Sequence, residues 1–144
     1  MVNYADILNL NHAMSSVGEP ETVYGGSRNY GENVIVTMTF RFALGIIEFS
    51  EQLREQRRFA FADQLLRSGC SVGANVREAQ SAESRADFVH KLKVAIKEAE
   101  ETEYWLDLCY YSANYPKPEK LSEEIVGIIK VLNKIISTTK RKGN

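Results

Sequence analysis

Residues 67–88 read RSGCSVGANVREAQSAESRADF and carry two glycines four positions apart, Gly69 and Gly73. Closely spaced glycines occur in phosphate-binding loops and also where two helices pack together. A phosphate-binding loop follows a strand, opens a helix and in the P-loop carries a lysine. Here the apolar residues before Gly69 recur at helical spacing, and that lysine is absent. The pattern therefore favours two glycines inside a helix over a nucleotide site.

Both glycines need a compensating contact, because a glycine in a helix interior costs about 1 kcal/mol relative to alanine. Their spacing places them on one face of the helix, where a neighbouring helix can approach closely. We predict a helix-packing seam at Gly69 and Gly73, with a large side chain such as Trp105 filling the groove. A bulkier residue at either glycine would overpack this seam, at a cost of about 1–3 kcal/mol.

The rest of the chain from residue 33 onward is also helical in pattern. A capping box, Ser84-x-x-Asp87, opens one helix, which ends near Ala113 because Pro116 and Pro118 follow. No segment alternates apolar and polar residues as a half-buried strand does. Four amphipathic helices with short connections predict an all-α, up-down-up-down four-helix bundle. The predicted helices lie near residues 36–56, 59–80, 84–113 and 121–139.

The chain divides into two parts. Residues 1–32 hold four glycines and Pro20, which predicts a flexible, poorly structured N-terminal extension. Residues 33–144 are predicted to form the bundle as a single domain. The stripe that should turn the first helix toward the core consists of Phe40, Ala43, Leu44, Ile47 and Leu53.

Composition excludes several functional classes. The 144 residues are 44% hydrophobic and 26% charged, with a net charge of −1 that creates no field to attract nucleic acid or an anionic membrane. No apolar run approaches the roughly 20 residues of a membrane span, and the N-terminus does not resemble a signal peptide. We therefore predict a cytoplasmic protein without a membrane partner. Cys70 and Cys109 are expected to be reduced, buried thiols, because no Cys/His cluster accompanies them.

We predict no catalytic residues, metal site, cofactor or small-molecule substrate, and hence no enzyme. Asp87-x-x-His90 is a single fragment of the paired motifs that di-iron bundles use, and the other histidine, His12, lies in the N-terminal extension. A surface histidine near a helix start is the preferred interpretation. Carboxylates crowd residues 98–107, but they flank the apolar stripe, which favours a solvated or interface face over acid–base catalysis.

Four polar residues of the opening stretch are candidate polar ties within the bundle or at an oligomer interface: Arg67, Asn75, Arg77 and Glu78. The two arginines could bind phosphate or pair with carboxylates, and pairing is favoured in a net acidic chain. Asn75 could fix the register of an assembly interface, as buried asparagines do in coiled coils, or it could simply be exposed.

Charge is uneven along the chain. Residues 98–124 hold eight acids and two bases, whereas residues 125–144 hold five bases and no acid. These opposite charges could attract each other across the bundle or between subunits, and solvation is the default interpretation. An aromatic group, which we expect to pack rather than to stack on bases, consists of Tyr104, Trp105, Tyr110, Tyr111 and Tyr115. The candidate nucleic-acid contacts are Lys130, Lys134, Lys140, Arg141 and Lys142.

The segment from Leu65 to Leu92, followed by KEAEETEYWL at residues 97–106, resembles a four-helix-bundle family first described from intervening sequences in bacterial 23S ribosomal RNA genes. The resemblance covers about residues 33–140 and implies a four-helix bundle, commonly assembled as a ring-like homopentamer. The residues that carry it are Arg67, Ser68, Gly69, Ser71, Gly73, Ala74, Asn75, Arg77, Glu78, Ala79, Asp87, Phe88, His90, Lys91 and Glu101 to Leu106.

A related branch of that family comprises the accessory variability proteins of diversity-generating retroelements, in which a basic pentamer binds a reverse transcriptase and nucleic acid. The present chain differs from that branch because it is not basic. Our first hypothesis is therefore a non-enzymatic scaffold or adaptor that self-assembles into a homopentamer. The alternative is an accessory factor that binds RNA, DNA or a reverse transcriptase.

Overall fold

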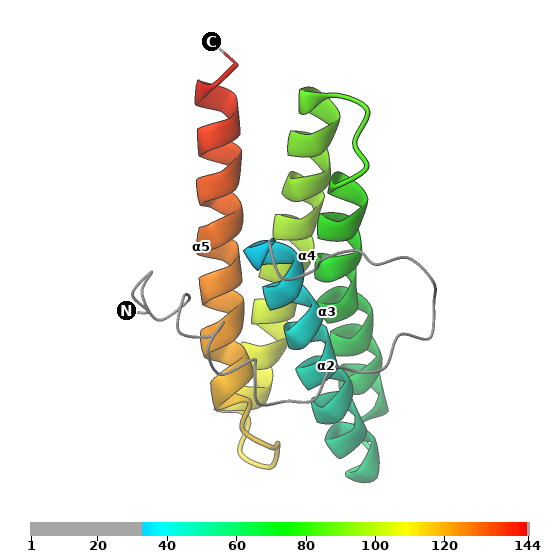
Figure 1. Cartoon of the computed structure of the whole chain (residues 1–144). Coiled ribbons are helices and arrows are strands. Elements are labelled where there is room, and N and C mark those ends of the chain that lie inside the picture. The colour runs from blue at the N-terminus through cyan, green and yellow to red at the C-terminus, as the bar shows by residue number, and fades with distance from the viewer. Residues whose placement is uncertain (1–32, 144) are drawn as a thin grey trace, which may run out of the picture.

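The computed structural model describes residues 33–143, and these residues fold into four α-helices and no strand. Neighbouring helices run in opposite directions and are joined by short connections (Figure 1). The all-α, up-down-up-down prediction is therefore confirmed for this part of the chain, whereas the predicted N-terminal extension lies outside the described residues. The helices are α2 (Val34–Glu55), α3 (Phe59–Ala79), α4 (Arg85–Tyr111) and α5 (Glu119–Arg141).

The helix α4 begins where its capping box predicts. At the start of α4 the Ser84 hydroxyl accepts a hydrogen bond from the Asp87 backbone N–H at 3.0 Å, and the Asp87 carboxylate accepts one from the Glu83 N–H at 3.2 Å. At the start of α2 the Asn33 amide donates to Gln80 Oε1 at 2.9 Å. Asn33 therefore ties the beginning of α2 to the end of α3.

The connection between α2 and α3 contains Arg57 in the left-handed region, at φ 60°. The next residue, Arg58, donates its backbone N–H to the Leu53 carbonyl oxygen at 2.8 Å, and Arg57 donates to the Arg54 carbonyl oxygen at 2.8 Å. Such bonds close the last turn of a helix when the residue after it is left-handed, a position that normally favours glycine. This tight reversal brings α3 back along α2.

Each helix contributes one apolar face to a single core, and α2 packs mainly on α3, α3 on α4 and α4 on α5, with a smaller α2–α5 contact. The inward face of α2 differs from the prediction. Leu53 is buried as predicted, but Phe40, Leu44 and Ile47 are exposed. The core side of α2 is instead formed by Ile35, Val36, Thr39, Phe42, Ile46, Phe49, Ser50 and Leu53.

Candidate functional site

The glycine seam, Gly69 and Gly73, faces α2. A Cβ atom added to Gly69 would lie 2.8 Å and 2.9 Å from the side chain of Ile46, which is fully buried. A Cβ atom added to Gly73 would lie 3.3 Å from the backbone oxygen of Thr39. The absence of side chains at these two positions is therefore what lets α2 and α3 approach closely.

Trp105 does not fill this seam, so the predicted role of its side chain is wrong. Its ring packs edge-on against Phe61 on α3, with ring centroids 5.6 Å apart, and against Tyr104. Its indole N–H donates to Glu101 Oε1 at 3.2 Å. The spacing of the glycines identified one face of α3, but Ile46 of α2 rather than Trp105 of α4 occupies that face.

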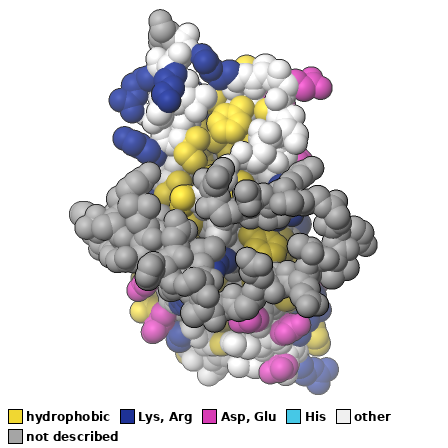
Figure 2. Space-filling view, in the orientation of Figure 1, with side chains coloured by type: hydrophobic (Ala, Val, Ile, Leu, Met, Phe, Trp, Pro, Cys, Tyr) yellow, Lys and Arg dark blue, Asp and Glu magenta, His cyan; other side chains and the backbone are white. Residues whose placement is uncertain are grey.

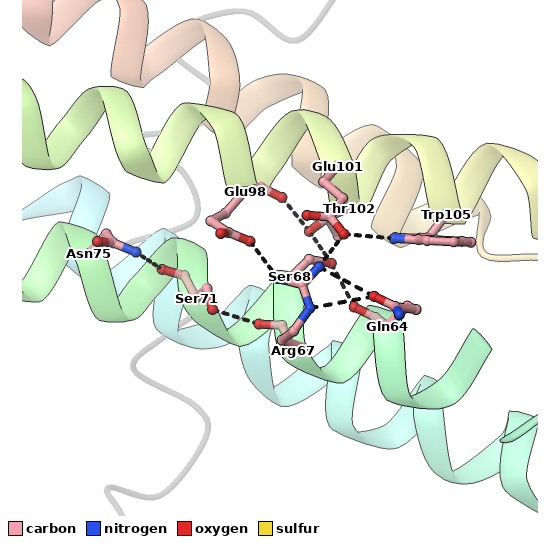
Figure 3. A network of polar contacts seen from close by, with 9 residues as sticks. All are labelled: Gln64, Arg67, Ser68, Ser71, Asn75, Glu98, Glu101, Thr102 and Trp105. Atoms are coloured by element: carbon pink, nitrogen blue, oxygen red, sulfur yellow. Dashed lines mark hydrogen bonds and ion pairs between the residues drawn. The ribbon is translucent and has the colours of Figure 1, made fainter. Parts of the chain in front are cut away.

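A polar network joins α3 to α4 (Figure 3). The Arg67 guanidinium donates to Glu98 Oε2 at 3.3 Å, forms a second ion pair with Glu101, and reaches Gln64 on its own helix. Since Glu101 also accepts from the Trp105 indole, this carboxylate connects the arginine to the aromatic group. Arg67 is thus a tie between two helices of one bundle.

Beneath Arg67 two hydroxyl groups meet in the core. Ser68 and Thr102 are fully buried, and the Thr102 hydroxyl lies 2.9 Å from Ser68 Oγ and 2.7 Å from the Glu98 carbonyl oxygen. The Ser68 hydroxyl donates to the Gln64 carbonyl oxygen at 2.9 Å. Helix carbonyls thus satisfy both groups, and no histidine or carboxylate of the described residues is placed to activate either as a nucleophile.

The other three predicted ties make different contacts, and Asn75 is linked to Arg67 only within α3, through Ser71 (Figure 3). The Asn75 amide donates to the Ser71 carbonyl oxygen at 2.8 Å, within α3. The Arg77 guanidinium lies over the Phe40 ring of α2, 5.5 Å from its centroid. Glu78 accepts from Lys91 of α4 at 3.1 Å, and this hydrogen bond raises the pKa of the Lys91 amine. The segment of residues 67–88 therefore connects α3 to α2 through Arg77 and to α4 through Arg67 and Glu78.

An open apolar groove of about 450 Å³ lies between α2 and α3. Its lining includes Phe40 and Arg77, whose guanidinium lies over the Phe40 ring. Cys70 contributes a thiol, and burial raises the pKa of that thiol, so it stays protonated at neutral pH. The groove thus offers shape and apolar surface without an activated nucleophile. It is lined by Val36, Thr39, Phe40, Ala43, Cys70, Gly73, Ala74, Arg77 and Glu78.

Charged groups collect on the other two helices. Burial raises the pKa of the Glu103 carboxyl on α4, with Asp107 and Glu100 adding to the effect. The basic residues of α5 are all exposed, and Figure 2 shows basic side chains gathered near the C-terminal end. None of the ion pairs between described residues includes any of Lys130, Lys134, Lys140, Arg141 and Lys142.

Within residues 33–143 no cluster of three or more histidine, cysteine, aspartate or glutamate side chains could hold a metal ion. Both cysteines are free; Cys109 is buried, and burial raises the pKa of its thiol to about 11. In the same part of the chain, no helix has both the length and the apolar character needed to cross a membrane.

The family model of the 23S rRNA-intervening sequence protein matches residues 31–136, which include all of α2, α3 and α4 and most of α5. The chain belongs to this family. No curated protein matches this 23S rRNA-intervening sequence family member.

A solved structure similar to this family member is that of a protein of unknown function from the S23 ribosomal protein family of Bacteroides thetaiotaomicron. The two chains are 41% identical, and the match covers 71% of the present chain and 97% of the other, with a TM-score of 0.67. Both matches thus agree with a four-helix bundle. The role of this protein must be inferred from its surface.

Sequence reasoning missed one surface of this family member, the exposed row formed by Phe40, Leu44 and Ile47. The row has helical spacing, which also describes a core stripe, and for that reason the sequence alone places it in the core. The signal that could have revealed this surface is a second set of apolar residues on the same helix, which includes Phe42, Ile46 and Phe49. A helix with two apolar faces is expected to pack against a partner on each face.

Proposed function

We propose that this protein is a non-enzymatic, self-assembling helical scaffold or adaptor, and that its assembled form is a homopentamer. The observation that carries self-assembly is the exposed apolar row of Phe40, Leu44 and Ile47 beside the open groove, because contiguous apolar surface marks interaction sites. The number five comes from the resemblance to a family whose bundles commonly form ring-like pentamers.

A non-enzymatic role is supported by how the polar groups of the bundle are used. Ser68 and Thr102 hydrogen-bond to helix carbonyls, and Arg67 binds two carboxylates. The thiols of Cys70 and Cys109 have raised pKa values, which keeps them as weak nucleophiles. These groups contribute to packing and assembly, not to proton transfer or covalent catalysis.

Light scattering coupled to gel filtration tests the proposal on the full chain. At micromolar concentration we expect a mass about five times the 16.3 kDa of one chain for a single ring, or about ten times for two paired rings. A discrete smaller oligomer would retain self-assembly but refute the pentamer. A monomer under the same conditions would refute the scaffold proposal altogether.

The exposed basic residues of α5 favour a second candidate function, an accessory factor that binds RNA, DNA or a reverse transcriptase. The family name supports an association with ribosomal RNA. If phosphate contacts dominate, affinity for structured RNA or single-stranded DNA must fall steeply as salt rises. Replacing Lys130 and Lys134 by glutamine should then weaken binding more than the same replacement of Lys93 and Lys97, two exposed lysines on α4. Absence of binding at low salt would exclude this function.

A further inference from the structure

The outward face of α2 carries a row of large apolar side chains. Phe40, Leu44 and Ile47 are 46%, 48% and 40% exposed, and at 3.6 residues per turn they fall within an arc of about 60°. We refer to these three residues as the α2 ridge. The ridge borders the apolar groove between α2 and α3, whose lining includes Phe40. It forms continuous apolar surface that the described helices leave uncovered.

Two opposite charges flank the ridge on one side. Arg41 and Glu48 are both exposed and lie seven residues apart, so two turns of helix bring them to within about 20° of the same edge. Among residues 33–143, neither forms an ion pair. The midpoint between them lies next to Leu44, the central residue of the ridge.

We propose that a second copy of this chain docks on the α2 ridge, with the two α2 helices antiparallel about a two-fold axis at Leu44. In this arrangement Phe40 of one copy faces the partner's Ile47, and the reverse contact forms by symmetry. Residues on the same edge of two antiparallel helices meet, so Arg41 faces the partner's Glu48 twice. A parallel arrangement would instead place this edge of the two copies on opposite sides of the contact and form neither pair, which is why the charges favour the antiparallel one.

The size of the ridge also bears on the contact. It spans about 11 Å of helix, whereas a stable interface buries about 800 Å² on each partner. The adjoining groove on α3, with Cys70 and Ala74 among its lining residues, adds a small apolar area, and the polar residues around the ridge must supply the rest. The contact therefore includes α2 and α3, and its two-fold axis passes between the two copies of α2.

This inference rests on the proposed self-assembly, and it assigns the ridge to a two-fold contact. A two-fold contact closes on itself, so it pairs two copies, or two rings of copies, and a five-membered ring requires a separate head-to-tail contact. The two proposals can therefore fail separately. A wild-type chain that is monomeric would refute both, whereas an assembled chain that ignores changes on α2 would refute only this one.

Charge reversal provides the first experiment. The variants Arg41→Glu and Glu48→Arg each place like charges in the contact, and sedimentation over a concentration series should show dissociation constants raised at least tenfold for each. The double variant restores opposite charges and should recover the wild-type mass. An equimolar mixture of the two single variants should also recover it, since each supplies what the other lacks. Circular dichroism checks that all variants are folded. Unchanged masses in the single variants, or no recovery in the double variant, would overturn the proposal.

Cross-linking provides the second experiment, because only a residue near a two-fold axis meets its own copy. In a Cys70→Ala, Cys109→Ala background, Leu44→Cys should form a disulfide-linked dimer under mild oxidation, since facing Cα atoms at the axis come within the about 4.4–6.8 Å that a disulfide spans. Val126→Cys on α5, also exposed, is the matched control and should stay monomeric. Equal cross-linking of both variants would overturn the proposal. So would a Leu44→Cys variant whose introduced thiol neither cross-links nor reacts with an alkylating agent, because another segment of the same chain would then cover the ridge.

Discussion

At the scale of single residues, three glycines in helices meet different surroundings. A Cβ at Gly69 would press into the buried Ile46 side chain, one at Gly73 would come within 3.3 Å of the Thr39 backbone, and one at Gly127 on α5 would meet nothing within 4 Å. Adding a methyl group therefore affects packing at the first two positions only.

We predict that Gly69→Ala lowers the free energy of unfolding by about 1–3 kcal/mol, because overpacking at Ile46 exceeds the gain in helix propensity. Gly73→Ala should be close to neutral, because the gain in helix propensity offsets the cost of moving the Thr39 backbone by a few tenths of an ångström. Gly127→Ala is the control and should raise the free energy of unfolding by about 1 kcal/mol. Urea denaturation measures all three. A Gly69→Ala protein as stable as the Gly127→Ala protein would contradict the close approach of α2.

Arg57 is the other residue with a backbone-specific prediction. Its φ of 60° costs about 1–2 kcal/mol for a residue with a side chain, and glycine adopts this conformation without that cost. Arg57→Gly should therefore raise the free energy of unfolding by up to about 1 kcal/mol, after the extra entropy of glycine in the unfolded chain is included. Thermal unfolding compares it with Arg57→Ala, which keeps the strain and should show no such gain.

Single residues also show how far sequence reasoning reaches. The spacing of Gly69 and Gly73 is sufficient to predict two close-packing positions on one helix face. It cannot identify the neighbour, because a spacing defines a face of its own helix and contains no information on which helix lies opposite. Size alone favours Trp105 as that neighbour, whereas the topology places Ile46 there.

At the scale of elements, the helices were predictable and the orientation of α2 was not. Capping residues and prolines mark the ends of helices directly, as Ser84 does for α4. α2 is apolar on two sides, so its periodicity fits a core face through Leu44 as well as one through Ile46. Which side of α2 is exposed follows only from the packing of α3 and α5 against its opposite side.

The acidic face of α4 gives a prediction about pH. Because the pKa of Glu103 is raised in the folded protein, folding favours its protonated form, and the ionised form lowers stability as pH rises through the folded pKa. Glu103→Gln removes this dependence and should raise the melting temperature at pH 7. The gain should disappear at a pH below the ordinary pKa of a glutamate. Glu55→Gln on α2 is the exposed control, and an equal gain in both variants at pH 7 would contradict the effect of burial.

At the scale of the whole molecule, the bundle separates its surfaces by helix. α2 and α3 carry the apolar groove, α4 carries acidic groups, and the end of α5 carries basic ones. The sequence revealed the charge clusters, because they are continuous along the chain. It did not reveal the groove, because Phe40 and Cys70 come together only when two helices pack.

Assembly through α2 predicts that stability depends on protein concentration, because association favours the folded, associated state by mass action. The melting temperature of the wild-type chain should rise with concentration over the micromolar range. That of Arg41→Glu should rise less, and at the lowest concentrations the two proteins should agree. Differential scanning calorimetry makes the comparison, and identical slopes would show that the ridge does not contribute.

The order of helix contacts also has a consequence for folding. Each of the strong contacts joins helices that follow one another in the chain, and only the smaller α2–α5 contact joins its two ends. Proteins dominated by such local contacts fold rapidly, since little chain entropy is lost before the first contacts form. We expect helical hairpins to form early and the docking of α2 on α5 to come last. Native-state hydrogen exchange should then find the two terminal helices, α2 and α5, opening at a lower free energy than α3 and α4, so the helix with the proposed docking face would be among the more readily detached.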